Sequence, residues 1–105
     1  MRRVNETIRE VLGDAIATGL KDPRIGFVTV TGVDTSPDLR TARVYVSVLG
    51  DQQERERSLA GLQSSHGVLQ SKIASAMRLK RTPTLTFEYD ESVERGDRIT
   101  RLLDE

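Results

Sequence analysis

The chain has 105 residues, a length typical of one domain, and we expect a single domain over residues 1–105. It contains no cysteine and one histidine, which excludes disulfides and leaves a poor ligand set for transition metals. No apolar run is long enough to span a membrane, and the N-terminus lacks a hydrophobic signal region. We therefore expect a cytoplasmic protein with no membrane partner.

The charged residues sum to a net charge of zero, but they are unevenly distributed. No acidic residue occurs between Glu56 and Glu88, whereas residues 1–56 carry −1 and residues 88–105 carry −4. The acid-free window contains the basic residues Arg57, Lys72, Arg78, Lys80 and Arg81. Such a distribution is typical either of a localised anion-binding face or of a solvated helix surface, and charge alone leaves both interpretations open.

Helical periodicity predicts a first helix over residues 2–20. Its apolar residues recur at three- and four-residue spacing: Val4, Ile8, Val11, Leu12, Ala15, Ile16 and Leu20. Gly19 and the Asp22-Pro23 pair end this helix, because proline disfavours helical geometry in the residue before it. The basic start of the helix is unfavourable for its dipole, so the arginines there serve another purpose or lie at a solvated helix end.

Two strand patterns follow and predict a long β-hairpin. Residues 25–33 are rich in β-branched and aromatic side chains, and residues 42–48 alternate strictly between apolar and polar. Pro37 and its neighbours Asp34, Ser36 and Asp38 favour a turn between the two strands. Two strands alone are marginally stable in water, so the remaining elements should pack against this hairpin.

A pair of helical segments comes next. Asp51 is placed to cap a helix that has few apolar residues, which we expect to be short and largely exposed. The run Ser64–Gly67 interrupts the pattern, and a second helical stripe extends from Val68 to Met77. We interpret this as two helical pieces joined at a kink, with Gly67 the residue best able to break helical geometry. A simple helix–loop–helix is the alternative.

The remaining residues predict a third strand and a short last helix. Leu85, Phe87 and Tyr89 alternate with polar residues, and a helix over 93–103 would follow. The predicted fold is thus α+β, with a three-stranded sheet covered by helices on one face. The crossover from the second strand to the third is long enough for parallel pairing.

Enzyme chemistry finds little support in these residues. There is no phosphate-binding loop motif, and nothing places a serine in a nucleophile elbow. His66 lies beside serines, where a surface role is commoner than a catalytic one. We expect no catalytic residue, no bound metal, no cofactor and no small-molecule substrate.

Nucleic-acid binding is better supported. Lys72, Arg78, Lys80 and Arg81 lie on or just after the second helical piece, and Ser64, Ser65, His66 and Gly67 precede it. Hydroxyl, imidazole and backbone N–H groups at a helix start suit phosphate and ribose contacts. The further candidates are Arg3, Arg9, Arg24 and Arg43. Because most of the four aromatic residues should be in the core, we expect recognition of the shape and backbone of structured RNA rather than base stacking on the sheet.

Several segments resemble the bacterial ribosome-binding factor A family, and the matching register runs nearly end to end. They are Arg3–Glu6 with Ile8–Glu10, Lys21–Thr31, Ser36–Leu39, Ala42–Gly50, Arg78–Pro83 and Asp90–Ser92. The resemblance implies a type II KH-like fold in the order α-β-β-α-(kink)-α-β, with a short C-terminal helix. The family has an Ala-x-Gly sequence at its interhelical kink, where this chain reads Ser65-His66-Gly67.

The resemblance also implies a function. Members of the family are non-enzymatic factors that bind the free small (30S) ribosomal subunit and its 16S rRNA, and they assist late maturation and rRNA end processing, notably in the cold. We expect a monomer that contacts this RNA. The alternative is a protein-interaction module that docks on ribosomal proteins or a partner enzyme through its sheet or its acidic last helix, near Ile99 and Leu102.

Overall fold

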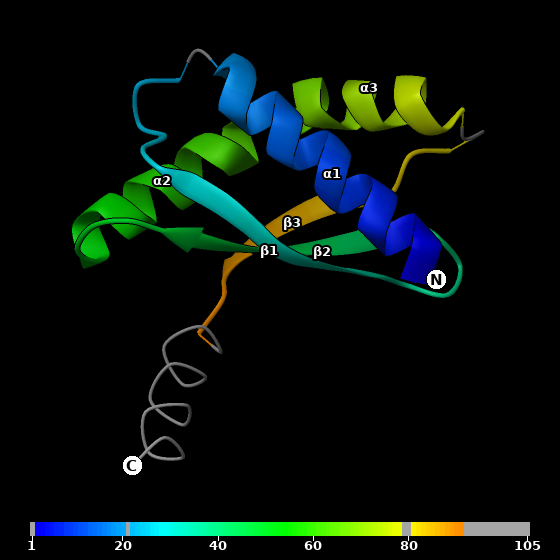
Figure 1. The fold of residues 1–105 in the computed structure, drawn as a ribbon, viewed down its shortest axis with the longest axis horizontal. Helices are drawn as coiled ribbons and strands as arrows, with labels where there is room; N and C mark the ends of the chain where they lie inside the picture. Colours follow the sequence, from blue (N-terminus) through cyan, green and yellow to red (C-terminus); the bar gives the residue numbers. More distant parts are fainter. Residues whose placement is uncertain (1, 21, 79–80, 92–105) are drawn as a thin grey trace.

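The computed structural model describes residues 2–20, 22–78 and 81–91, and it has two layers (Figure 1). A three-stranded sheet forms one layer and three helices form the other, which confirms the predicted α+β class and element order. The elements are α1 (Arg2–Gly19), β1 (Val28–Thr35), β2 (Thr41–Val48), α2 (Gln52–Ser64), α3 (His66–Met77) and β3 (Thr84–Tyr89). The short helix expected over 93–103 lies outside the described residues.

The strands run in the order β1-β2-β3, with β2 in the centre. β1 and β2 pair antiparallel, which confirms the hairpin, and β2 and β3 pair parallel through the α2–α3 crossover. In this register Val44 of β2 lies between Val33 of β1 and Phe87 of β3. A bulge between Val30 and Gly32 adds one residue to β1, so residues on both sides of it can face the helices.

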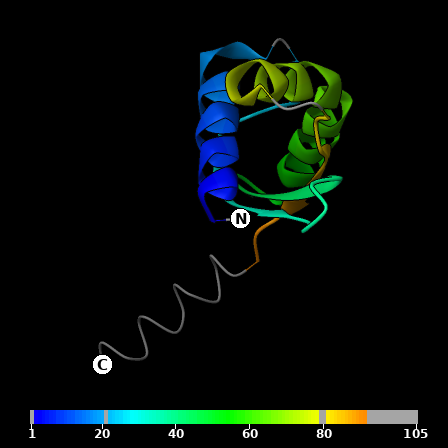
Figure 2. The same ribbon diagram turned by 90° about the vertical axis from the view of Figure 1, so that its right-hand side faces the viewer.

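The core lies between the sheet and the helices. Figure 2 shows α1, α2 and α3 on one side of the sheet, and among the described residues no helix covers the other face. The alternating residues predicted to face inward are buried: Ala42, Val44, Val46 and Val48. The helices contribute the fully buried side chains Ile8, Leu12, Leu62, Leu69 and Ile73. Apolar periodicity therefore determines which face of each element meets the others.

The first strand begins three residues later than its composition predicts. Residues 25–27 lie in the connection from α1, and the N–H of Ile25 donates to the carbonyl of Asp22 over 3.1 Å. The expectation that most of the four aromatic side chains are in the core is wrong: Phe87 is buried there, whereas Tyr45 and Tyr89 are half-buried and Phe27 is 80% exposed. High β-propensity describes residues that suit a pleated surface, and it cannot show where backbone pairing begins.

The helix pair differs from prediction in two ways. α2 has 13 residues and is not short, although it is exposed as expected, with only Ser58, Gly61 and Leu62 buried. Asp51 caps it as predicted, because Oδ1 accepts a 2.8 Å hydrogen bond from the N–H of Glu54. The second difference is the residue at which the helix breaks.

The break falls at Ser65 and not at Gly67. Ser65 has φ −91° and ψ 7°, and its N–H donates to the carbonyls of Gly61 and Leu62. Gly67 lies in the first turn of α3. One residue in the bridge region suffices to change the helix direction, and every residue type can adopt that conformation, so the break requires no glycine.

Candidate nucleic-acid interface

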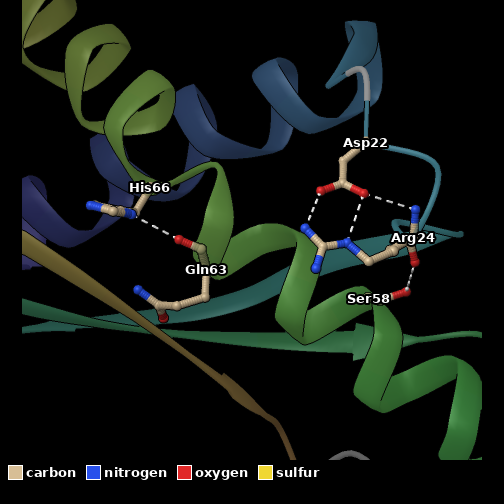
Figure 3. A network of polar contacts seen from close by, with 5 residues as sticks. All are labelled: Asp22, Arg24, Ser58, Gln63 and His66. Atoms are coloured by element: carbon tan, nitrogen blue, oxygen red, sulfur yellow. Dashed lines mark hydrogen bonds and ion pairs between the residues drawn. The ribbon is translucent and has the colours of Figure 1, made fainter.

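The four residues predicted around the kink lie together at the α2–α3 junction. Ser64, His66 and Gly67 are exposed, and Ser65 is half-buried. His66 Nδ1 donates a 2.8 Å hydrogen bond to the carbonyl of Gln63, which leaves Nε2 for a ligand (Figure 3). The Ser65 side chain makes no capping hydrogen bond to α3. The junction therefore presents polar groups that are available to a ligand.

Gln63 fixes the position of this junction, and sequence reasoning missed it. Its Nε2 donates to the carbonyl of Leu85 over 3.2 Å, and its Oε1 accepts from the N–H of Phe87 over 3.3 Å. One side-chain amide thus satisfies two backbone groups of β3. A glutamine near a helix end has no sequence pattern that would indicate such a role, since the partner strand lies more than twenty residues away.

A second fixed element lies beside the junction, in the connection between α1 and β1. Asp22 accepts three hydrogen bonds from Arg24: one from its backbone N–H at 2.9 Å, one from Nε at 3.0 Å and one from Nη2 at 2.6 Å (Figure 3). The bonds from the guanidinium, followed by that from the backbone N–H, lower the pKa of Asp22 to about 2. The arginine is therefore locked in one orientation.

α2 holds this connection in place through two small residues. Ser58 Oγ accepts a 3.1 Å hydrogen bond from the N–H of Gly26 and donates to the carbonyl of Arg24 over 3.4 Å. A Cβ on Gly61 would lie 2.7 Å from Cγ1 of Ile25, so only glycine allows this close approach. The connection is thus packed and hydrogen-bonded despite lying in no helix or strand.

Between this connection and the junction lies an open hollow of about 780 Å³. Its lining residues come from the end of α1, the following connection and α3: Leu20, Asp22, Pro23, Arg24, Ser65, Val68 and Lys72. Three residues predicted separately from the sequence, Arg24, Ser65 and Lys72, therefore share one site. Sequence reasoning named these three but gave no indication that they meet.

The other predicted cations of the helix pair lie further along it. Arg78 ends α3 in the left-handed conformation, with φ 53°, and its N–H donates to the carbonyl of Ala74 over 2.9 Å. Arg78 and Arg81 are exposed, and Lys80 lies outside the described residues. Within the described part of the chain, neither arginine forms an ion pair, and nor does Lys72. These charges are thus available to an anion.

The remaining candidate arginines lie on other elements. Arg3 and Arg9 are on α1, where Arg9 Nη2 lies 3.0 Å from Oε2 of Glu6. Arg43 lies on β2, and its Nε is 3.6 Å from Oε2 of Glu88 on β3. Unlike Arg24, none of these three lines the hollow beside the junction. The structure therefore does not gather all predicted cations into one cluster.

Other kinds of site can be assessed over residues 2–20, 22–78 and 81–91. In this part of the chain, no three histidine, aspartate or glutamate residues are grouped so as to hold a metal ion. Over the same residues, no helix combines the length and apolar character needed to cross a membrane.

Comparisons with known proteins agree with these observations. The family model described as ribosome-binding factor A matches residues 1–103. A ribosome-binding factor A of Anaeromyxobacter sp. (strain K) is 58% identical over 104 residues, which cover 98% of this chain and 75% of the relative.

Structures with the same fold support the same family. The crystal structure of ribosome-binding factor A from Thermus thermophilus aligns with a TM-score of 0.73 and 27% identity, covering 84% of this chain and 93% of that one. A homology model of the Thermus thermophilus factor, fitted into the cryo-EM map of a 30S complex with that factor, aligns with a TM-score of 0.69 and 28% identity, covering 83% of this chain and 91% of that one. The chain belongs to the ribosome-binding factor A family.

Proposed function

We propose that this chain binds the free 30S ribosomal subunit through its 16S rRNA and assists late maturation of the subunit, including processing of the rRNA ends. It acts in the cytoplasm as a monomer without catalysing a reaction, with residues 1–105 forming one KH-like unit, and its action is most needed in the cold. The proposal rests on family membership, because the fitted Thermus thermophilus relative belongs to a 30S complex.

The charges of the helix pair support RNA as the direct partner. Lys72, Arg78 and Arg81 are exposed and unpaired within the described residues, and no acidic residue interrupts the sequence from residue 57 to residue 87. A cation with no carboxylate partner does not have to break an ion pair before it binds phosphate, so its binding costs the least free energy. Exposed Ser64 and His66 add hydrogen-bonding groups beside them.

The sheet offers weaker support for a function as a protein-docking module. Its open face carries exposed threonines and the Arg43–Glu88 ion pair, which is not the large apolar patch typical of such interfaces. The residues near Ile99 and Leu102, which such docking would use, lie outside the described residues. We therefore favour RNA over a protein partner.

Cosedimentation with purified ribosomal particles tests this function. The purified chain is mixed with separated 30S subunits, 50S subunits and 70S ribosomes, and the pellets are quantified at several salt concentrations. We expect the chain to pellet with 30S subunits and not with the other two. Equal recovery with all three particles, or none with 30S subunits, would contradict the proposal.

A matched pair of single variants tests the site. Lys72→Ala should weaken 30S binding and lower the slope of log K against log salt by roughly 0.7–0.9 if it removes one phosphate contact. Arg40→Ala, which also removes an exposed cation but from the hairpin loop beside Asp38, should leave the slope within experimental error. Equal effects of the two variants would reject the helix pair as the RNA-binding side.

A further inference from the structure

The hollow beside the α2–α3 junction combines three kinds of surface. Leu20, Pro23 and Val68 supply apolar area, and Val68 is 55% exposed although it is a large aliphatic residue. Lys72 supplies an ammonium group with no ion-pair partner among the described residues, and Ser65 supplies a hydroxyl that caps no helix. A volume of about 780 Å³ is within the roughly 300–1,000 Å³ typical of small-ligand pockets.

Arg24 contributes to this hollow in an unusual way. Two of its guanidinium nitrogens, Nε and Nη2, are bonded to the two carboxylate oxygens of Asp22, so this edge of the fork is occupied. The side chain is still 42% exposed, which leaves Nη1 and the guanidinium plane for a ligand. A guanidinium plane held in this way can stack on a nucleobase, as an aromatic ring does.

We propose that this hollow binds one unpaired nucleotide. Its base stacks on the Arg24 guanidinium plane between Pro23 and Val68, the Ser65 hydroxyl bonds to a base edge or the ribose, and Lys72 pairs with the phosphate. The inference deepens the proposed function and depends on it, because it assigns an unpaired nucleotide to one part of a surface that binds structured RNA. Asp22 and Arg24 cancel each other's charge, so Lys72 leaves a single positive charge for a single phosphate.

The wall of the hollow is prepared for such a ligand. Ser58 and Gly61 hold the connection that carries Pro23 and Arg24 against α2, and Asp22 holds the guanidinium. A ligand therefore does not have to order these groups, which lowers the entropic cost of binding. A peptide with an apolar side chain beside a carboxylate could also use Val68 and Lys72, but it would leave the guanidinium plane unused.

An NMR titration tests the proposal. The ¹⁵N-labelled chain is titrated with a six-nucleotide oligoadenylate, with a 12-base-pair RNA duplex, and with a peptide carrying a leucine between two glutamates. We expect the oligoadenylate to shift the backbone amides of Arg24, Ser65, Val68 and Lys72, and neither other probe to shift this group. Shifts confined to other residues, or stronger shifts of this group by the duplex or the peptide, overturn the proposal.

Matched variants assign the effect to the hollow. Val68→Glu should weaken oligoadenylate binding at least about fivefold, which is the lower end of the roughly 1–3 kcal/mol that one stacked base contributes. Ser71→Glu adds the same charge to an exposed position of α3 outside the lining residues, and should weaken binding less than threefold. Thermal unfolding of both variants serves as the control that they are folded. Equal losses would show that only charge matters, which overturns the stacked site.

A further variant tests the guanidinium plane itself. Arg24→Lys keeps the charge and loses the plane, so it should weaken oligoadenylate binding several-fold with an unchanged salt slope. Unchanged affinity overturns the stacking role. Cosedimentation separates this inference from the proposed function. If the wild-type chain binds 30S subunits but oligoadenylate does not bind in the hollow, only the nucleotide site is overturned. If the wild-type chain binds no 30S subunit, the proposed function is overturned.

Discussion

The helix-covered side of the sheet and its open face both carry basic residues, but these residues differ in whether a carboxylate lies beside them. On the open face, Arg43 lies 3.6 Å from Glu88, so an RNA phosphate would have to compete with a carboxylate. On the helical side, Lys72 and Arg78 are exposed and have no such partner among the described residues. The number of cations on a surface is therefore a poor guide to an anion-binding site. The better guide is the number of cations that have no carboxylate partner.

The two sides also differ in how their backbone is fixed. The open face presents mainly side chains of the paired strands β1, β2 and β3. The helical side includes a connection that lies in no helix or strand and is held by Ser58, Gly61 and the Asp22–Arg24 pair. This packing allows a loop to act as a rigid wall of a site. Substitutions on each side can test these differences.

The largest expected effect separates the inner and outer surfaces of α3. Leu69 is fully buried, so Leu69→Ala should lower the free energy of unfolding by about 2–5 kcal/mol. Its neighbour Val68 is 55% exposed, and Val68→Ala should change the same quantity by less than about 0.5 kcal/mol. Urea denaturation measures both. Similar losses for the two variants would mean that α3 packs on a different face.

A pair of glycines tests the packed connection. Gly61→Ala forces a methyl group against Ile25, and we expect a loss of about 1–3 kcal/mol in the free energy of unfolding. Gly13→Ala places a methyl group where no atom lies within 4 Å, so the higher helix propensity of alanine should add about 0.5–1 kcal/mol. Urea denaturation gives the two signs. A stabilising Gly61→Ala would show that the connection does not pack tightly on α2.

Releasing Arg43 tests the role of cations that have no carboxylate partner. Glu88→Gln removes the carboxylate beside Arg43, so RNA binding should tighten a few-fold and the salt slope should steepen by up to roughly 0.7–0.9. Glu56→Gln removes an equal charge from an exposed residue of α2 that forms no ion pair within the described residues, and serves as the control. If both variants act equally in a filter-binding assay, net charge explains the effect and ion pairing does not.

The smallest expected effect concerns acid stability. The pKa of Asp22 lies near 2, below its ordinary value of 3.8, so its pairing with Arg24 stabilises the fold above about pH 4. This contribution is lost as the pH falls from about 4 to about 2. Asp22→Asn should therefore flatten the dependence of stability on pH in that window, and Arg24→Gln should flatten it in the same way. A wild-type slope in either variant would contradict the pairing.

Regular structure is predictable where side-chain periodicity is strong. The alternation over residues 42–48 predicts the buried face of β2, and Asp51 caps α2 as its position suggests. The sequence predicts a kink within the run Ser64–Gly67, and the structure confirms it there, although the residue that breaks the helix is Ser65 and not Gly67. Glycine has the greatest backbone freedom, but the break lies at Ser65, directly after the buried Leu62 and after Gln63, whose side chain bonds to β3.

The candidate site is less predictable, because it depends on contacts between residues distant in sequence. The pairing of Asp22 with Arg24 is local, but their approach to Lys72 depends on how α1, its connection and α3 pack. Likewise, the need for glycine at position 61 becomes visible only when Ile25 lies against it. A single sequence carries no periodic pattern for such contacts.

The role of the helix pair is tested most directly by the salt dependence of 30S binding, measured for the wild type and for a variant in which Lys72, Arg78, Lys80 and Arg81 are all alanine. If these cations bind phosphates, the variant should bind at least tenfold more weakly, and its plot of log K against log salt should be shallower by roughly 0.7–0.9 for each phosphate that is no longer bound. A variant that binds 30S subunits with the affinity and slope of the wild type would contradict the claim that this side of the molecule meets the RNA.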